Sequence, residues 1–343
     1  MITVVKPGMF TTVQDSGRWG YQAYGMSVAG AMDRYAYCLA NLLVDNDCEA
    51  AVLEMTMLGG TFRFNVSTQI AVCGADMGAL LNGTELRPWQ AVQVAKGSEL
   101  VFSYALSGCR AYLAVQGGID VPVVMGSRST YTRAIIGGFK GRALQAGDVL
   151  QIDDYQGLCG TVRELPAQLV PRYETEIRLR VLLGPQDDLF TAEGIETLFN
   201  SSYTISSEAD RMGYRLDGPK IQHIGKADIV SDALCQGAIQ VPAHGMPIVM
   251  MSDRATTGGY TKIGTVIGPD LTKLAQAKPG DTVRFIKCTD ADAVEALCAE
   301  RDTYCQAKQI FSTAEKSRTF EEQVRQYNVT IDGRKFSVKI KER

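Results

Sequence analysis

The sequence predicts a mainly β protein with few helices, made of two related halves and a charged tail. Strand-like stretches are short and are separated by glycine, asparagine and aspartate. Three motifs of the first half recur in the second half in the same order. We therefore expect a β-barrel or sandwich domain at 1–160, a second one at 170–288, and a tail of different character at 289–343.

The strands are predicted from stretches that mix β-branched and aromatic side chains. Such residues fit the half-buried, pleated surface of a sheet, whereas glycine, asparagine and aspartate favour turns. The stretches are 61–72, 91–103, 111–115, 149–153, 177–183 and 281–287. Short strands with frequent turns are typical of a sandwich or barrel.

Helices are predicted at only a few places. Asp33 is a candidate N-cap, because the apolar residues that follow it recur at helical spacing on one face. A second helix is expected directly after Asp187 and Asp188, with its apolar side formed by Phe190, Ile195, Leu198 and Phe199.

The two halves are linked by repeated motifs. Ala-Asp-Met-Gly at 75–78 returns as Ala-Asp-Arg-Met-Gly at 209–213, and the Gly-Asp pair at 147–148 returns at 280–281. Gln-Gly-Gly-Ile-Asp-Val-Pro at 116–122 returns as Gln-Gly-Ala-Ile-Gln-Val-Pro at 236–242. Shared turn chemistry would explain the Gly-Asp pairs but not the longer motif. We infer a duplication, with the copies joined near 155–175.

The tail begins with a segment of helical composition. Residues 290–327 are charged and rich in alanine, glutamate and glutamine. Apolar residues alternate with polar ones on both sides of Asp332-Gly333. An Asp-Gly pair between alternating runs predicts a β-hairpin.

Composition argues against several functions. The 343 residues carry a formal net charge of only −3, which does not suit a nucleic-acid-binding protein. The only histidines, His223 and His244, are too few for a histidine-rich metal site. The chain contains no Gly-x-x-x-x-Gly-Lys-Ser/Thr loop and no Gly-x-Ser-x-Gly motif. Short apolar runs, no apolar signal core in 1–10 and nine scattered cysteines predict a cytoplasmic, reduced chain without a membrane partner.

Several motifs resemble those of one family. They are Val-Gln-Asp-Ser-Gly-Arg at 13–18, Ala-Met-Asp at 31–33, Gly-Ser-Arg-Ser-Thr at 126–130, Gly-Pro-Gln at 184–186, Asp-Arg-Met-Gly-Tyr-Arg-Leu at 210–216 and Asp-Arg-Ala-Thr-Thr-Gly-Gly-Tyr at 253–260. The chain resembles the 5-oxoprolinase/urea-amidolyase carboxyltransferase family over roughly 1–287. This family includes the C-type component of bacterial 5-oxoprolinase, allophanate hydrolase subunit 2-like proteins, an antagonist of a sporulation-kinase inhibitor and the carboxyltransferase domain of urea carboxylase. Two departures are Ala31, where the family usually has proline, and Arg254, where relatives often have glutamine.

The resemblance implies two cyclophilin-like β-barrels with the reacting centre near their junction. It also implies that this chain is the C-type component of an ATP-dependent 5-oxoprolinase complex, which opens 5-oxoproline to glutamate. The expected partners are a B-type component, similar to allophanate hydrolase subunit 1, and an A-type component of the lactam-utilisation class. ATP is then bound by, or shared with, those partners.

Two other functions remain open at this point. The first is a biotin-dependent carboxyltransferase that uses a separate biotin carrier. Residues 327–340 resemble the first hairpin of such a carrier domain, although its Met-Lys-Met motif is absent. The second is a non-catalytic regulator that binds a homologous inhibitor protein. All three functions would share one fold, so the fold cannot separate them.

Either reaction needs a water-poor pocket for a small planar amide, with donors aimed at a developing oxyanion. The candidate catalytic residues are Asp253, Arg211 and Asp210. The candidate substrate-binding residues are Gln236, Gln240, Thr256, Thr257, Tyr260 and Arg215. Glutamine matches an amide edge, and arginine clamps a carboxylate through two parallel hydrogen bonds. We expect these residues to line one cleft between the halves.

A structural explanation competes with each of these roles. Asp210 and Arg211 can form an internal ion pair at a barrel corner. Gln236 and Gln240 can satisfy backbone groups inside a barrel.

Overall fold

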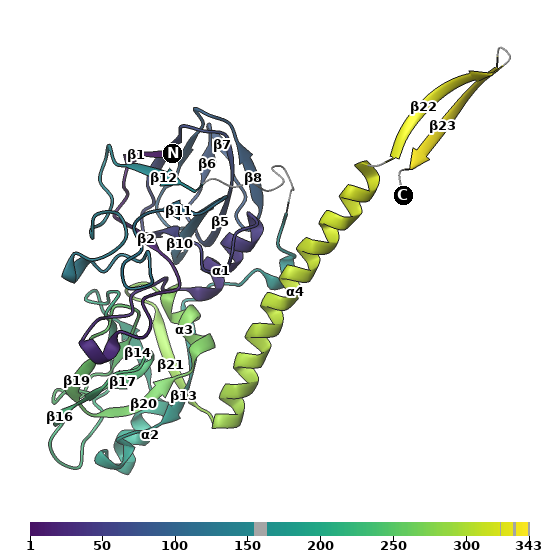
Figure 1. Ribbon diagram of the computed structural model, residues 1–343. Coiled ribbons are helices and arrows are strands. Elements are labelled where there is room, and N and C mark those ends of the chain that lie inside the picture. The colour runs from purple at the N-terminus through teal and green to yellow at the C-terminus, as the bar shows by residue number, and fades with distance from the viewer. Residues whose placement is uncertain (154–162, 323, 332–333, 342–343) are drawn as a thin grey trace.

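Two β-rich units lie one above the other, and a long helix runs beside both of them (Figure 1). The computed structural model describes residues 1–153, 163–322, 324–331 and 334–341, with side chains as far as residue 311. The chain is mainly β with few helices, as the sequence predicts. The predicted boundary at 155–175 falls partly outside the described residues.

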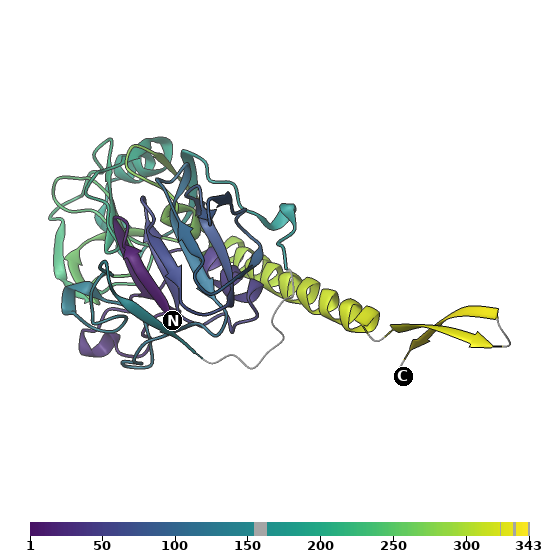
Figure 2. The same ribbon diagram turned by 90° about the horizontal axis from the view of Figure 1, so that it is seen from above.

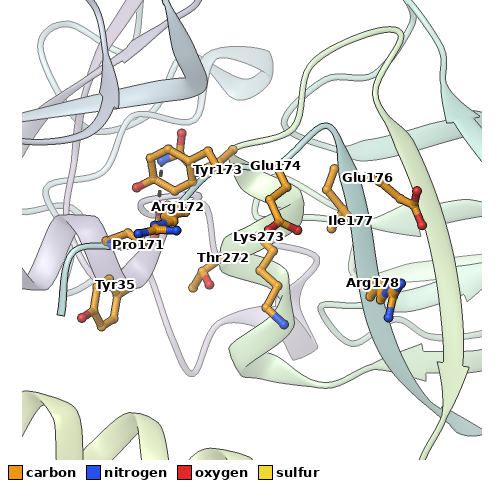
Figure 3. Close-up of a pocket in the computed structure, with 12 residues that line it drawn as sticks. Tyr35, Pro171, Arg172, Tyr173, Glu174, Glu176, Ile177, Arg178, Thr272 and Lys273 are labelled. Atoms are coloured by element: carbon orange, nitrogen blue, oxygen red, sulfur yellow. Dashed lines mark hydrogen bonds between the residues drawn. The ribbon is translucent and has the colours of Figure 1, made fainter. Parts of the chain in front are cut away.

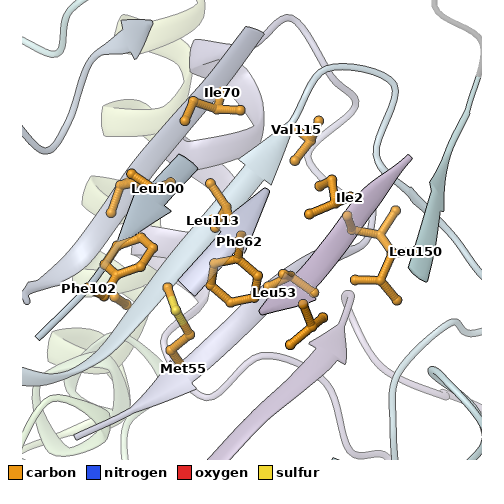
Figure 4. Close-up of a cluster of buried hydrophobic side chains, with 14 of the residues drawn as sticks. Ile2, Leu53, Met55, Phe62, Ile70, Leu100, Phe102, Leu113, Val115 and Leu150 are labelled. Atoms are coloured by element: carbon orange, nitrogen blue, oxygen red, sulfur yellow. The ribbon is translucent and has the colours of Figure 1, made fainter. Parts of the chain in front are cut away.

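The first unit is built from two sheets that face each other around one core. One sheet has seven strands in the order β11 (Ile119–Asp120), β12 (Val149–Ile152), β1 (Ile2–Lys6), β4 (Thr61–Phe64), β9 (Glu99–Val101), β6 (Leu80–Leu81) and β7 (Thr84–Glu85). The other has five, in the order β2 (Phe10–Gln14), β3 (Val52–Thr56), β10 (Ser107–Val115), β5 (Thr68–Asp76) and β8 (Ala91–Val94). Side chains from both sheets, such as Ile2, Phe62 and Leu113, are fully buried between them (Figure 4).

The second unit is a closed barrel. Its strands follow the order β13 (Glu176–Leu183), β20 (Lys262–Val266), β17 (Ala238–Gln240), β18 (Ile248–Met250), β15 (Gly213–Asp217), β14 (Ser202–Ile205) and β21 (Thr282–Lys287). Strand β13 closes the barrel because it pairs antiparallel with β20 and parallel with β21. A separate two-stranded sheet is formed by β16 (Asp228–Ala233) and β19 (Thr257–Tyr260).

One repeated motif has the same local geometry in both units. The Asp148 carboxylate accepts a hydrogen bond from the backbone N–H of Gln145 at 2.7 Å. The Asp281 carboxylate accepts one from the backbone N–H of Lys278 at 2.9 Å. Each aspartate therefore fixes the turn that leads into the next strand, β12 or β21.

The first predicted helix is confirmed, and the second begins later than expected. Helix α1 (Arg34–Leu43) is capped by Asp33, whose Oδ1 accepts the N–H of Ala36 at 3.0 Å. A short 3₁₀ turn covers Asp187–Leu189, and α2 (Ala192–Asn200) starts only after Thr191. The Thr191 hydroxyl accepts the N–H of Gly194 at 3.0 Å, so Thr191 is the N-cap of α2.

Helix α4 (Asp290–Glu322) contacts both units. Near its start, Ala293 and Ala296 pack against Ile267, next to α3 (Gly268–Ala275). Farther along, Ala307 and Phe311 pack into the cluster around α1. A single helix therefore packs against both units.

The tail ends in the predicted hairpin. Strands β22 (Val324–Ile331) and β23 (Arg334–Lys341) pair antiparallel, and Figure 2 shows them projecting away from the body beyond α4. The predicted turn at Asp332-Gly333 lies outside the described residues. None of the helices in the described part is both long and apolar enough to cross a membrane.

A segment before α1 crosses from the first unit to the second. The Ala29 N–H donates to the Ser252 carbonyl at 3.1 Å, and the Ser27 hydroxyl donates to the Asp253 carbonyl at 3.2 Å. Met32 is 1% exposed and packs into the core of the barrel. This crossing brings residues of both units to one buried junction.

Candidate functional site

Arg211 and Asp253 meet at the junction between the two units. Arg211 lies just before β15, and Asp253 lies just after β18. The guanidinium donates through Nε to Asp253 Oδ2 at 3.0 Å and through Nη2 to Oδ1 at 2.8 Å. Both side chains are almost fully buried. The two segments that the sequence analysis placed together do meet in the structure. The ion pair between them is buried and does not face a cleft.

The first unit supplies a second carboxylate and a carbonyl to Arg211. Glu54 on β3 accepts from Arg211 Nη1, and the Gly30 carbonyl accepts from Nη2 at 2.7 Å. Gly30 has φ +88°, and a Cβ there would lie 3.0 Å from the backbone of Gly17, so only glycine fits. Arg211 thus joins the two units through charge-assisted hydrogen bonds.

The charges at this junction balance. Arg110 donates through Nη1 to the Tyr214 hydroxyl at 2.5 Å and to the Ala275 carbonyl at 2.6 Å, and its Nε lies 3.9 Å from Glu54. Two buried guanidinium groups therefore face two buried carboxylates. Burial acts to lower the pKa of Arg211, but Asp253 and Glu54 outweigh it and raise that pKa, so the guanidinium stays charged.

Glu54 is the residue that sequence reasoning missed. Its Oε2 accepts the Met32 N–H at 2.8 Å and the Tyr112 hydroxyl at 2.9 Å. Both its oxygens are thus engaged, which explains how a 1% exposed glutamate is tolerated. The available signal was an acid inside the apolar run of β3, where a charge is expected only with a partner.

A chain of hydrogen bonds leads from Glu54 to Asp33. The Tyr112 hydroxyl, which donates to Glu54, accepts the Asp33 N–H at 2.8 Å. Asp33 Oδ2 accepts Gln276 Nε2 at 2.7 Å, and Gln276 Oε1 accepts the Arg110 N–H at 3.0 Å. Burial raises the pKa of Asp33 to about 6, against the opposing hydrogen bonds from Gln276 and the backbone. This carboxyl can therefore change protonation near neutral pH.

Asp33 and Gln276 form part of the wall of a cavity of about 490 Å³ beside the junction, shown in Figure 3. The lining residues come from α1, α3, β13 and the segment before β13: Asp33, Tyr35, Pro171, Arg172, Tyr173, Glu174, Glu176, Ile177, Arg178, Thr272, Lys273 and Gln276.

Charged side chains of both signs surround this cavity. Lys273 pairs with Asp270 at 2.8 Å, and Glu176 pairs with Arg284 at 3.2 Å. Among the described residues, Arg172 and Arg178 have no ion-pair partner, and both are exposed residues that line the cavity. The cavity therefore combines a buried acid–amide wall with two guanidinium groups that are open to an anion.

The other predicted residues do not converge on one cleft. Asp210 does not pair with Arg211. Its Oδ2 lies 3.5 Å from Nη2 of Arg133, and the side chains of Asp210 and Arg133 are both about half exposed. Arg215 points outward and lies 3.5 Å from Glu208. In β15 alternate side chains face opposite sides, so burying Tyr214 and Leu216 turns Arg215 to solvent.

Thr256, Thr257 and Tyr260 belong to or adjoin the outer strand β19, where Thr257 and Tyr260 are exposed. Gln236 Nε2 reaches Ser252 Oγ at 3.5 Å. Gln240 is buried, and its Nε2 has no hydrogen-bond partner in the described part of the chain. The expectation of one cleft lined by all these residues is therefore wrong, since none of them lines the cavity.

The N-terminal motif holds a turn of the first unit. Asp15 Oδ1 accepts the Gly17 N–H at 2.9 Å and the Ser127 hydroxyl at 2.6 Å. Arg18, fully buried, donates to the Ser129 carbonyl at 2.8 Å. These contacts join the motif at 13–18 to the motif at 126–130, so both are explained by packing.

A match to a family model shows to which protein family the chain belongs. The model for the carboxyltransferase domain, subdomains A and B, matches residues 24–287. This chain belongs to that carboxyltransferase family. The matched region ends at the last barrel strand, before α4.

Relatives within the carboxyltransferase family fall into two groups by length. The chain is 38% identical to the C-type component of 5-oxoprolinase from Escherichia coli over 296 residues, covering 86% of this chain and 94% of that one. It is 34% identical to urea amidolyase of Saccharomyces cerevisiae, covering 83% of this chain but only 16% of that one. The solved urea amidolyase of K. lactis superposes with a TM-score of 0.85 at 30% identity, covering 89% of this chain and 20% of that chain.

Proposed function

We propose that this chain is the C-type component of an ATP-dependent 5-oxoprolinase complex and opens 5-oxoproline to glutamate together with A-type and B-type components. The proposal rests on the share of each relative's length that this chain covers. The chain covers 94% of the C-type component of E. coli 5-oxoprolinase but only 16% of the yeast urea amidolyase. A component that matches nearly end to end is expected to share the assembly, whereas a match to one part of a long enzyme shows only a shared domain.

The cavity at the junction is the proposed site for the lactam. 5-Oxoproline is a five-membered cyclic amide with one carboxylate, and a cavity of about 490 Å³ is large enough to admit it. The cavity-lining residues Arg172 and Arg178 would hold the carboxylate. The ring amide would then lie toward Asp33 and Gln276, whose oxygens and nitrogens match its donor and acceptor.

Asp33 is the proposed proton carrier at this site. A carboxyl with a pKa of about 6 can both accept and return a proton near neutral pH. Opening of the ring requires a proton at the leaving nitrogen, and Asp33 lies on the cavity wall where that nitrogen would be placed. The Arg211–Asp253 pair is proposed to hold Glu54, and through Tyr112 also Asp33, in position.

ATP is proposed to bind mainly on the partner components. Triphosphates commonly bind at helix N-termini, where backbone N–H groups and the helix dipole attract anions. In the described part of the chain each α-helix start already carries an acid: Asp33 at α1, Glu193 at α2, Asp270 at α3, and Asp290 and Asp292 at α4. These starts do not fit a triphosphate.

A second function is favoured by one observation. Strands β22 and β23 form a hairpin in the structure, and the sequence of residues 327–340 resembles the first hairpin of a biotin-carrier domain. Helix α4 and its hairpin would then be a docking element for a separate biotin carrier, and the reaction would be carboxyl transfer from carboxybiotin to a small amide.

The test is reconstitution with purified A-type and B-type components. The complete mixture should hydrolyse ATP only when 5-oxoproline is present, and this chain alone should not. In a parallel assay, this chain should be supplied with biotinylated carrier, a biotin carboxylase, ATP, bicarbonate and urea. Carboxyl transfer without 5-oxoproline-dependent ATP hydrolysis would replace the first function by the second.

A further inference from the structure

Three cysteines meet in a second cavity, between α1 and α4. This cavity has a volume of about 290 Å³ and is separate from the one at the junction. Cys38 comes from α1, Cys48 from the loop after it, and Cys305 from α4. Cys38 and Cys48 are half-buried, and Cys305 is exposed. The two helices lie side by side in Figure 1.

The thiols of Cys38 and Cys48 line the same cavity and belong to the same packed cluster of α1 and α4. The interaction with Cys38 is the main reason that the pKa of Cys48 falls to about 7. The ammonium of Lys308 on α4 acts in the same direction, whereas burial and Asp47 oppose it. The same interaction and burial raise the pKa of Cys38.

The other buried cysteines show what an inert thiol looks like in this protein. Burial raises the pKa of both Cys73 and Cys109, and neither lines this cavity. They behave as small apolar side chains. Cys48 differs because it has a thiol partner, a nearby cation and access to solvent through the cavity, which are the conditions for a reactive cysteine.

We propose that Cys48 is an oxidant-sensitive thiol and that Cys38 resolves it to an intramolecular disulfide in the cavity that α4 closes. The oxidant is a peroxide. The Cys48 thiolate attacks one peroxide oxygen, the O–O bond breaks, and Cys48 becomes a sulfenic acid while hydroxide leaves and takes up a proton. The Cys38 thiol then attacks the Cys48 sulfur, the S–O bond breaks, and water leaves. Two thiols are oxidised by two electrons, and one peroxide is reduced to two waters.

Formation of the disulfide would change how α4 packs on the first unit. Tyr304 and Phe311 of α4 pack in the same cluster as Cys38 and Cys48. A disulfide needs the two β-carbons at about 3.8 Å with a fixed torsion, so its formation would shift the loop after α1 against α4. Because α4 contacts both units, oxidation of this pair would act on the element that links them.

The charges around the cavity matter for the pH at which Cys48 reacts. The groups that face it are Arg34 from α1, Asp47 and Glu49 from the loop, and Arg301 and Lys308 from α4. Cys48 also lines a neighbouring cavity, where Arg163 pairs with Asp45 at 2.8 Å, and Glu300 of α4 interacts with Arg34. Of the charged groups that act on Cys48 itself, Lys308 favours the thiolate and Asp47 opposes it. Alkylation of Cys48 in the full chain by iodoacetamide should therefore have its midpoint near pH 7, against about 8.5 for an ordinary cysteine.

The decisive experiment treats the full chain with one equivalent of hydrogen peroxide and identifies the products by peptide mass spectrometry. We expect a Cys38–Cys48 disulfide. The Cys38→Ser variant should stop at a Cys48 sulfenic acid that dimedone traps, and Cys48→Ser should form neither product. Cys235→Ser, which removes an exposed thiol of the second unit, is the matched control and should behave as the parent. A Cys48–Cys305 link, prior oxidation of another cysteine, or an alkylation midpoint above pH 8 would each overturn the proposal.

Discussion

Replacing Arg211 with methionine should strongly destabilise the protein. The substitution keeps an unbranched apolar stem but removes the cation that bridges Asp253 on the barrel and Glu54 on the first unit. Asp253 loses both of its ion-paired hydrogen bonds. Glu54 keeps its hydrogen bonds from Met32 and Tyr112, but its remaining cation, Arg110, lies 3.9 Å away. Removing one partner of a buried ion pair typically costs about 3–5 kcal/mol, because the remaining charge is left without compensation.

The assay is thermal unfolding followed by circular dichroism. At roughly 2–4 °C per kcal/mol, the expected cost lowers Tm by at least about 6 °C. The matched control is Arg215→Met, four residues along the same motif. Its guanidinium is about half exposed and lies 3.5 Å from Glu208, so its loss should cost less than about 1 kcal/mol.

The pH dependence gives a second, independent readout for Arg211→Met. Burial raises the pKa of Asp253 and Arg211 lowers it, so without the cation the folded-state pKa of Asp253 rises further above its unfolded value. The folded variant then binds protons more tightly than the unfolded chain, so its stability should rise as pH falls toward 5. The double variant Arg211→Leu/Asp253→Leu removes both charges and should recover part of the loss. If Arg211→Met melts within 2 °C of Arg215→Met at pH 7, the buried bridge does not hold the two units together.

Two other changes test the surroundings of the site. Asp33→Asn keeps an N-cap for α1 but removes a carboxyl whose folded pKa, about 6, lies above its ordinary value. The parent should therefore gain stability as pH falls through 6, and the variant should not. If Tm is measured from pH 5 to 8 and changes in parallel for the two proteins, the prediction is contradicted. Phe311→Ala opens a cavity where α4 packs on the first unit and should cost about 3 kcal/mol. Limited proteolysis should then cut α4 faster than in the control variant Val294→Ala, because Val294 is 58% exposed. Equal cutting rates would show that Phe311 does not hold α4 against the first unit.

Local features of the fold were predictable from the sequence. Asp33 begins α1 because a carboxylate followed by apolar residues at helical spacing is a self-contained signal. The Asp-Gly hairpin and the turns at Asp148 and Asp281 are local in the same sense. Helix α3 was missed, although Pro269 and Asp270 in its first turn are favourable start residues.

The junction was only half predictable because its contacts are remote in sequence. Asp253 and Arg211 were selected from motifs, but their link to Glu54 spans 157 positions and no local pattern reports it. The cavity likewise depends on how the segment before β13 lies against α1 and α3. Arg215 and Tyr260 were grouped with Arg211 and Asp253 by nearness along the chain. In a strand that nearness does not place side chains on one face.

The most direct test of the proposed function measures 5-oxoproline-dependent ATP hydrolysis by the complex reconstituted with Arg172→Ala/Arg178→Ala. Both arginines are exposed, so the variant should fold and assemble normally. Loss of a charge-assisted hydrogen bond to the substrate carboxylate, worth about 1.5–3 kcal/mol, predicts a KM for 5-oxoproline that is at least about tenfold higher. The control Arg63→Ala removes an exposed arginine that pairs with Glu99 on the first unit and should leave KM unchanged. A variant complex that assembles and shows the KM of the parent would contradict the assignment of this cavity as the substrate site.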